Sequence, residues 1–158
     1  METGLRVRLA TADDRAAIIA VVNAAFAVET FFEGTRTDDE RLAKMMQAQE
    51  FLVGEENGRI VASVSTEERG ERGYFGMLAV DPSLQGKGVG RVMVEAAEDF
   101  LRQRGCEVVD ITVLSLRPEL PTYYRNLGYV QTGIEEFHPS RPFKPGTECI
   151  AIVMTKEL

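Results

Sequence analysis

Hydrophobic and polar positions follow two different periods in the first third of the chain. Residues 5–9 alternate apolar and basic side chains, which is typical of a half-buried strand. Residues 18–26 instead carry Ile, Val and Phe at helical spacing, and Leu42, Met45 and Met46 repeat that spacing further on. Thr11 with Asp14, and Thr37 with Glu40, form capping-box pairs that predict where these two helices begin.

The remaining chain continues this alternation of strands and helices. Asn57-Gly58 predicts a tight hairpin turn between two strands, and Gly105 is a suitable left-handed residue after a helix. That helix starts near Gly88 and is expected to bury Val92, Ala96, Phe100 and Leu101. The predicted strands are 5–9, 51–55, 60–66, 74–80, 107–114, 129–137 and 149–155. A loop is expected at 70–73. A short helix is expected to begin near Pro118 and Pro121 and to end near Gly128. The order is β-α-α-β-β-β-α-β-α-β-β, an α/β (α+β) arrangement.

The junction between strand 74–80 and the helix that follows is rich in glycine. After Asp81-Pro82 the chain reads Gln85-Gly86-Lys87-Gly88-Val89-Gly90-Arg91. Three glycines at alternate positions let backbone N–H groups approach an anion closely, and a helix start adds unpaired donors and the positive end of its dipole. This segment therefore predicts a phosphate-binding loop, although a flexible connector would need the same residue type.

Two familiar nucleotide motifs do not fit this loop. A P-loop needs Ser or Thr after Gly86-Lys87, where Gly88 stands. A dinucleotide fingerprint that begins at Gly86 needs a small residue where Arg91 stands, and one that begins at Gly88 needs it at Met93. The sequence thus argues against a nucleotide-dependent enzyme of either type.

The pattern Gln/Arg-x-x-Gly-x-Gly/Ala is satisfied by Gln85, Gly88 and Gly90. With the preceding Leu78-Ala79-Val80-Asp81-Pro82, it resembles the acetyl-coenzyme A signature of the GNAT superfamily of N-acetyltransferases. The resemblance implies a single domain over residues 1–158, with a mixed, mostly antiparallel seven-stranded sheet flanked by about four helices. It also implies that the cofactor pyrophosphate is held by loop amides, within the set Leu78, Ala79, Val80, Gln85, Gly86, Lys87, Gly88, Val89, Gly90 and Arg91.

A second motif, Tyr123 to Tyr129, follows in the order that this family has. Taken alone, it is more simply a helix end with buried aromatics. Family resemblance implies that Tyr124 stands by the cofactor sulfur and acts as a general acid when an amine attacks the thioester. The expected activity is acetyl transfer from acetyl-coenzyme A to a primary amine. A non-catalytic acyl-coenzyme A-binding module of the same fold is the alternative.

The general base and the role of Arg117 stay open. Many family members carry a glutamate on the strand before the loop, but residues 74–79 contain no carboxylate. Glu29, Glu33, Glu135, Glu136 and His138 are candidates elsewhere, and each is more readily interpreted as a solvated loop charge. A water chain is an equal alternative. Arg117 replaces an asparagine that the family often has, so it either reaches the cofactor or only caps the short helix.

The composition of the chain limits which molecules it is expected to bind. The chain has 158 residues and a net charge of −7, which disfavours nucleic acid as a partner and agrees weakly with a cationic substrate. Its two cysteines, Cys106 and Cys149, indicate neither a zinc site nor a disulfide framework, and we expect no metal. The absence of a signal core or a membrane-length apolar run leads us to expect a cytoplasmic protein. The acceptor is expected to be a small-molecule or peptide amine between loops 29–34 and 138–146, and a homodimer is left open.

Overall fold

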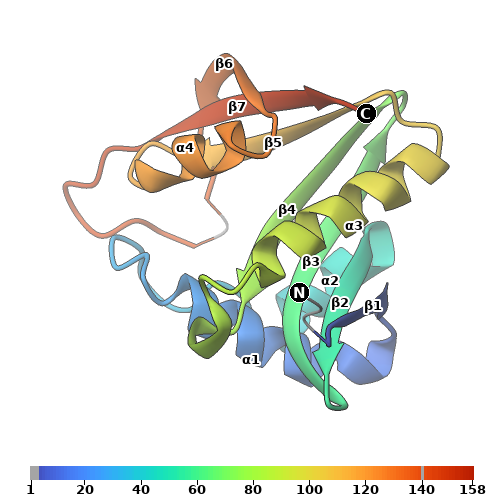
Figure 1. Ribbon diagram of the computed structural model, residues 1–158. Coiled ribbons are helices and arrows are strands. Elements are labelled where there is room, and N and C mark those ends of the chain that lie inside the picture. The colour runs from blue at the N-terminus through green and yellow to red at the C-terminus, as the bar shows by residue number, and fades with distance from the viewer. Residues whose placement is uncertain (1–3, 140) are drawn as a thin grey trace.

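The computed structural model describes residues 4–139 and 141–158, so that Met1, Glu2, Thr3 and Ser140 lie outside the described residues (Figure 1). Its elements are β1 (Arg6–Leu9), α1 (Arg15–Phe26), α2 (Asp39–Ala48), β2 (Glu50–Glu56), β3 (Arg59–Arg69), β4 (Arg72–Val80), α3 (Val89–Gln103), β5 (Val108–Leu114), α4 (Glu119–Arg125), β6 (Val130–Glu136) and β7 (Ile150–Glu157). The predicted order of strands and helices is confirmed.

The strands form one seven-stranded sheet in the order β1-β2-β3-β4-β5-β7-β6. Neighbouring strands are antiparallel except for β4 and β5, which are parallel. This is the mixed, mostly antiparallel sheet that the sequence predicted. The parallel pair is joined by a helical crossover, α3, as parallel neighbours require.

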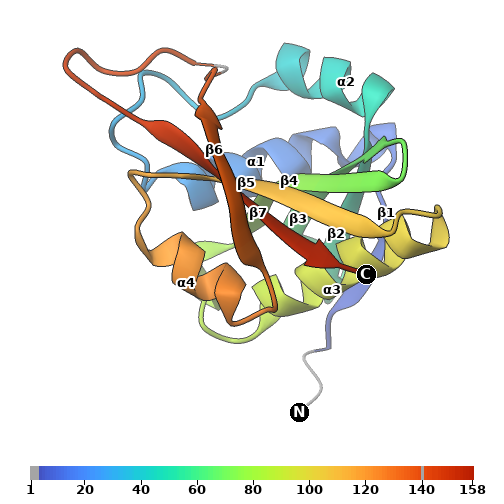
Figure 2. The same cartoon turned by 90° about the horizontal axis from the view of Figure 1, so that it is seen from above.

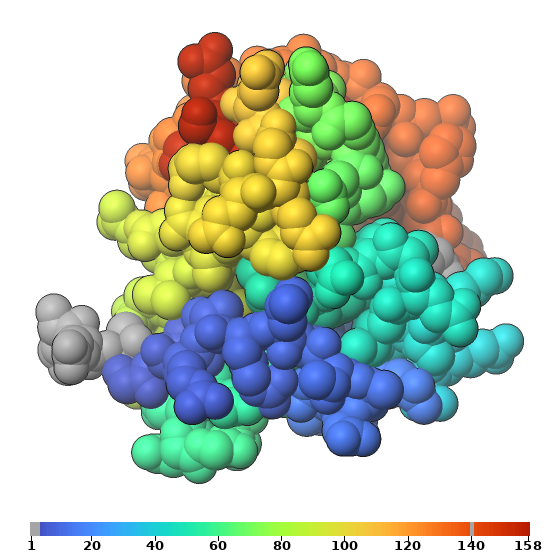
Figure 3. All heavy atoms as spheres, turned by 90° about the vertical axis from the view of Figure 1, so that its right-hand side faces the viewer, coloured from blue at the N-terminus to red at the C-terminus, as the bar shows by residue number. Residues whose placement is uncertain are grey.

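Helices cover both faces of the sheet (Figure 2). On one face α1 and α2 pack over a cluster that includes Ile18, Leu42 and Phe51. On the other face α3 packs over a larger cluster that includes Met93 and Leu101. Figure 3 shows the end of the molecule where α3 (yellow) lies between the first segments of the chain (blue) and the β3–β4 hairpin (green). None of the described helices combines the length and the apolar character that crossing a membrane requires.

Local signals place most element boundaries. Thr11 and Asp14 form the predicted capping box, which opens a 3-10 turn directly before α1. Asn57 and Gly58 both have positive φ, 54° and 76°, as a type I′ hairpin turn requires. The predicted box at Thr37 is wrong, because Asp38 is the N-cap of α2 and its side chain accepts a hydrogen bond from the Arg41 backbone. The loop expected at 70–73 is also shorter, since Arg69 already pairs with Arg72.

The buried face of α3 differs from the predicted one. Val92, Ala96 and Phe100 are only partly buried, whereas Leu101 is fully buried as expected. The core face instead holds Val89, Met93, Val94 and Ala97, together with Glu98. Glu98 is satisfied by the Tyr129 hydroxyl, which donates to it at 2.7 Å, and by the Lys156 ammonium at 3.1 Å. Apolar residues occupy both candidate faces, so packing against the sheet decides between them.

We expect the Arg8–Asp14 pair to make stability depend on acidic pH. Arg8 donates to both Asp14 oxygens, at 2.8 and 2.9 Å, and lowers the pKa of Asp14 to about 2. Because the folded-state pKa lies below that of an unfolded aspartate, the stabilisation is complete above about pH 4 and is lost as pH falls through about 2. Denaturant unfolding of Asp14→Asn should show a loss of about 1–2 kcal/mol at pH 7 that shrinks near pH 2.

The exposed neighbour Asp13 provides the control for this experiment. Asp13→Asn should leave the free energy of unfolding unchanged at both pH values. A deficit for Asp14→Asn that is equally large at pH 2 and pH 7 would show that the ion pair is not its source.

Candidate active site

A gap opens in the sheet between β4 and β5. The two strands are paired only where Arg72–Tyr74 lies beside Val108–Asp110, and no further register pair joins them in the described part of the chain. Figure 1 shows β5, β7 and β6 swinging away from β4 beyond this point. Met77, at the bulge where β4 shifts its register with β3, has a positive φ of 50°, which is uncommon for a residue with a side chain.

A cavity of about 1270 Å³ occupies this gap. Its walls include residues 75–78 of β4 and 111–114 of β5, and it extends to the glycine loop, α2, α4 and the segment after β6. Sites for a single small ligand are commonly about 300–1,000 Å³. The gap therefore has room for two molecules to meet between the strands.

The glycine loop forms one end of the cavity. Gly86 and Gly88 have φ of 80° and 84°, and Gly88 is the N-cap of α3. A Cβ atom at either glycine would meet no atom within 4 Å, so the space beside the loop is open. The first turn of α3 contains no acidic residue and its N-cap makes no side-chain hydrogen bond. These features are those of an anion site at a helix N-terminus.

The predicted loop residues divide into two groups. Leu78, Val80, Gln85, Gly86, Gly88, Gly90 and Arg91 line the cavity. The side chains of Ala79 and Val89 are instead buried in the two cores, and exposed Lys87 is not part of the wall. The Gln85 side-chain amide donates to the Val80 carbonyl at 3.3 Å, which fixes the entry to the loop.

A close contact explains why position 90 is a glycine, and the sequence alone did not indicate this contact. A Cβ atom there would lie 2.8 Å from the Tyr123 hydroxyl. The start of α3 and the end of α4 thus approach each other closely at Gly90, and a side chain at this position would push Tyr123 aside.

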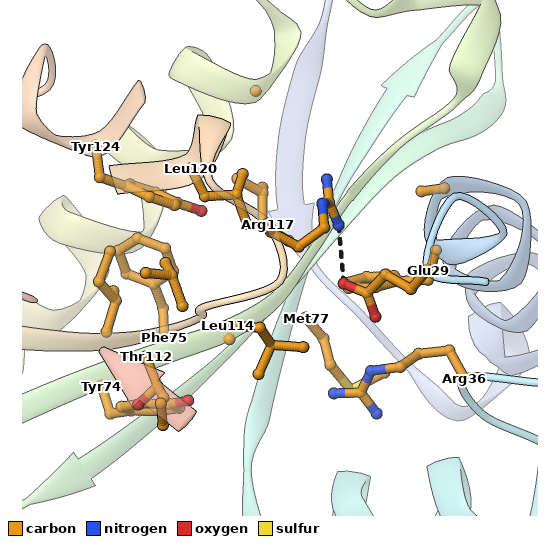
Figure 4. A pocket seen from close by; sticks show the side chains of 18 of the residues that line it. Glu29, Arg36, Tyr74, Phe75, Met77, Thr112, Leu114, Arg117, Leu120 and Tyr124 are labelled. Carbon is orange, nitrogen blue, oxygen red and sulfur yellow. Dashed lines mark hydrogen bonds and ion pairs between the residues drawn. The ribbon is translucent and has the colours of Figure 1, made fainter. Parts of the chain in front are cut away.

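Tyr124 lies on α4 and its side chain points into the gap (Figure 4). The residue is 7% exposed, and its ring packs against Phe75, Tyr123 and Tyr129 with centroids 5.1–6.2 Å away. Its hydroxyl makes no hydrogen bond within the described residues. Burial raises the pKa of Tyr124 above its ordinary value, so the hydroxyl keeps its proton at neutral pH.

Glu29 is buried, and the interpretation of it as a solvated loop charge is wrong. Only 6% of the residue is exposed. Arg117 donates to one carboxylate oxygen at 2.8 Å, shown in Figure 4, and Arg141 donates to the other at 3.2 Å. Each oxygen of Glu29 is thus engaged by an arginine, which explains how a glutamate is tolerated at this depth.

This buried cluster also joins the two loops at the rim of the cavity. Loop 27–38 and the segment after β6 are linked by backbone hydrogen bonds from Glu33 to Pro142 and from Lys144 to Phe31. The Phe32 and Phe143 rings stack with centroids 4.8 Å apart. Arg141 donates to the Gly34 carbonyl as well as to Glu29. The loops predicted to flank the acceptor are therefore adjacent and held together.

The other predicted base candidates are solvated. Glu33, Glu135, Glu136 and His138 are exposed, as expected for loop charges, and the last three lie at the rim of the cavity. Arg117 donates to Glu119 at 2.6 Å in addition to Glu29, so it bridges α4 and loop 27–38. The described residues include no group of three or more His, Cys, Asp or Glu side chains able to hold a metal ion.

Sequence reasoning missed several basic residues in the cavity wall, among them Arg36, Arg41 and Lys44. Arg36 precedes α2 and reaches into the cavity in Figure 4, while the other two lie on α2. In the sequence they look like ordinary surface charges of a polar helix and of the loop before it, and only the fold shows that this segment borders the gap.

Comparison with known proteins agrees with this geometry. The model of the acetyltransferase (GNAT) family matches residues 19–129. The chain is 30% identical over 150 residues to the mycothiol acetyltransferase of Propionibacterium freudenreichii, a match that covers 88% of this chain and 47% of that protein. A match to a second curated relative, an acetyltransferase of Pectobacterium atrosepticum, covers 56% of that protein. The chain therefore spans about half the length of the curated relatives it matches.

Two solved structures have the same fold. The ribosomal-protein-S18-alanine N-acetyltransferase of Escherichia coli superposes with a TM-score of 0.77 at 19% identity, over 97% of this chain and 93% of that one. YncA of Salmonella typhimurium, a putative acetyltransferase solved with its cofactor acetyl-CoA, gives a TM-score of 0.75 at 24% identity, over 99% and 95%. The family match spans more than half of the chain and the fold agrees with it, so the chain belongs to the acetyltransferase (GNAT) family.

Proposed function

We propose that this chain transfers an acetyl group from acetyl-coenzyme A to a primary amine. The observation that carries the proposal is the cavity between β4 and β5, which has an anion-binding helix N-terminus at one end and the Tyr124 hydroxyl within it. A phosphate-bearing molecule held at the loop would extend between the separated strands, and an amine would enter from the opposite side.

The loop residues fit the coenzyme. Backbone amides at Gly86, Gly88 and the first turn of α3 would face its pyrophosphate, with Arg91 adding positive charge. Open space beside both glycines leaves room for phosphate oxygens, which a side chain would fill. When bound, the coenzyme supplies an activated acetyl thioester. What the chain contributes is position, which is worth about 7 kcal/mol or more in making a bimolecular step effectively unimolecular.

Tyr124 would serve as the general acid. As the amine nitrogen bonds to the acetyl carbon and the carbon–sulfur bond breaks, negative charge collects on the sulfur. The Tyr124 hydroxyl, protonated because burial raises its pKa, donates a proton there, and the proton that the amine loses passes through water and restores the hydroxyl. A backbone N–H near Leu78, on the stretch of β4 that does not pair with β5, is the proposed donor to the carbonyl oxygen of the acetyl group.

A water molecule is the proposed proton acceptor. The inward end of β4 has no carboxylate, and both oxygens of Glu29 are engaged by arginines. An alkylamine with a pKa near ~10.4 costs about 4.6 kcal/mol to deprotonate at neutral pH, whereas an α-amino group with a pKa near ~8 costs about 1.4 kcal/mol. A site without a general base therefore favours acceptor amines of low pKa. Rates that do not vary with the pKa of the amine would contradict this part of the proposal.

An acceptor screen tests the proposed function. The chain is incubated with acetyl-coenzyme A and a panel of amino acids, peptides, polyamines and aromatic amines, and free thiol is measured. Thiol release that depends on an amine supports the proposal. Binding of coenzyme A without release across the whole panel would favour a non-catalytic binding module.

We expect Arg91→Gln to weaken acetyl-coenzyme A binding without affecting stability. Within the described residues, the one ion pair of Arg91 is with Glu95 on the exposed side of α3, at 3.2 Å, so the fold loses little. Loss of a charge beside the pyrophosphate should raise the KM for acetyl-coenzyme A about threefold to tenfold, and less at high salt. Steady-state kinetics at two salt concentrations measure this.

Arg102→Gln is the matched control, since Arg102 also forms an exposed ion pair on α3, with Asp99, and lies outside the cavity wall. Its KM should equal that of the wild type. Equal KM values for both variants would remove Arg91 from the proposed coenzyme site.

A further inference from the structure

The cavity has the opposite charge balance to the chain as a whole. The chain contains 18 Lys and Arg residues against 25 Asp and Glu. Among the described residues that line the cavity, seven are Lys or Arg and three are Glu. A cavity that concentrates cations inside an acidic protein creates a local potential that attracts an anion.

The coenzyme phosphates would neutralise only the basic residues at the glycine-loop end of the cavity. Arg91 lies at the start of α3, on one face of the sheet. Arg36, Arg41 and Lys44 come from the loop before α2 and from α2 itself, which cover the opposite face (Figure 2). We call the part of the cavity bordered by these three residues the acceptor end. A coenzyme bound at the glycine loop places its phosphates on the face of the sheet opposite this end.

Glu29 does not neutralise the acceptor end. Its two oxygens accept hydrogen bonds from Arg117 and Arg141, so two cations share one carboxylate at this point. Arg117 has a second acidic partner in Glu119. The two other carboxylates of the lining, Glu135 and Glu136, are exposed on β6 at the rim, beside His138. Arg41 has an acidic partner in Asp38, at 3.0 Å, which is not part of the cavity lining. Among the described lining residues, basic side chains therefore outnumber carboxylates at the inner wall.

Arg36 is the best placed of these cations. Its guanidinium lies beside the Met77 side chain and below Glu29 in Figure 4, and it is 5.3 Å from the centre of the Phe26 ring. Burial lowers the pKa of Arg36, which means that its charge is poorly hydrated where it stands. An anion beside a poorly hydrated guanidinium is held strongly, and the planar fork suits the two oxygens of a carboxylate.

We propose that the acceptor is an amine that also carries a carboxylate, bound at the acceptor end by Arg36 with support from Lys44. This deepens the proposed acetyl transfer and rests on it. The carboxylate would orient the molecule so that its amino group points toward the gap between β4 and β5. Phe26 and Met45, which line the same end, would contact an apolar part of the acceptor.

Matched acceptors test the carboxylate directly. Leucine is compared with leucinamide and isoamylamine, and 4-aminobutyrate with butylamine, by amine-dependent thiol release from acetyl-coenzyme A. We expect kcat/KM to be at least tenfold higher for the carboxylate member of one of these sets. The preference of leucine over leucinamide would be especially informative, because a larger fraction of the less basic amide is unprotonated at neutral pH, so the amide should react faster if the carboxylate plays no part.

The variant Arg36→Gln locates the binding group. It should raise the KM for the preferred carboxylate acceptor tenfold or more, while the KM for acetyl-coenzyme A and the rate with the member that lacks a carboxylate stay near wild type. Arg36→Lys should restore part of the affinity. Arg15→Gln, an arginine on α1 outside the cavity wall, is the control and should behave as wild type.

The outcomes separate the two levels of the proposal. Equal rates for members with and without a carboxylate, or a preference for amines that lack one, overturn the carboxylate-bearing acceptor and leave acetyl transfer intact. An Arg36→Gln variant that folds and keeps the wild-type KM for the acid also overturns it. Silence with every acceptor removes acetyl transfer itself, and the acceptor class falls with it. The wild-type comparison decides the matter even if Arg36→Gln does not fold.

Discussion

Tyr124→Phe is expected to bind acetyl-coenzyme A as the wild type does and to turn over about 10²-fold to 10⁴-fold more slowly, the range that a general acid contributes. The substitution removes one oxygen and keeps the ring that packs against Phe75 and Tyr129. Its hydroxyl has no hydrogen-bond partner within the described residues, so no other group loses a contact. Steady-state kcat and coenzyme binding by calorimetry measure the two effects separately.

Tyr123→Phe is the matched control on the same helix. Its hydroxyl lies beside the Gly90 backbone, and the residue is 38% exposed. Removal of this oxygen should leave kcat within about twofold of wild type, because exposed substitutions usually change little. An unchanged kcat in Tyr124→Phe would eliminate Tyr124 as the acid, and equal losses in both variants would indicate disturbed packing of α4.

Glu29→Gln should lower the free energy of unfolding by about 3–5 kcal/mol, the usual cost of removing one partner from a buried ion pair. The side chains of Arg117 and Arg141 are 20% and 7% exposed, and both would lose a charged partner. For a chain of this size the loss corresponds to a fall of about 10 °C in Tm. Thermal unfolding monitored by circular dichroism measures it.

The same variant distinguishes a structural role from a catalytic one. Glu33→Gln, at an exposed position in the same loop, should unfold like the wild type. If Glu29 joins the two loops, kcat well below the melting temperature should fall far less than stability does, and the KM for the acceptor should rise. An unchanged Tm with a collapsed kcat would instead make Glu29 the general base.

The order of elements and the glycine loop could be predicted because their signals are local. Asn57-Gly58 dictates its turn through backbone conformation, and the Gln85 to Gly90 spacing sits at a strand-to-helix junction that is visible in the sequence. The N-cap of a helix could be predicted only where a single residue at the helix start was suited to be the cap. Thr37 and Asp38 are adjacent cap formers, and the side chain of the second reaches the helix.

Features that depend on distant contacts could not be predicted. Glu29 is 88 residues from Arg117 and 112 from Arg141 in the sequence, so nothing near it indicates a buried pair. The core face of α3 was mispredicted because a charged residue, Glu98, lies within it and is compensated by Tyr129, just before β6, and by Lys156 of β7. The basic acceptor end likewise combines segments whose proximity only the gap between β4 and β5 creates.

Direct transfer across this gap is the central claim, and a single-turnover experiment tests it most directly. The chain is mixed with one equivalent of isotopically labelled acetyl-coenzyme A and an excess of the best acceptor, and both the amine and the intact chain are analysed by mass spectrometry. We predict one labelled N-acetyl group on the amine for each thiol released, with the mass of the chain unchanged throughout. Label retained on the chain, or thiol released without an acetylated amine, would contradict the account.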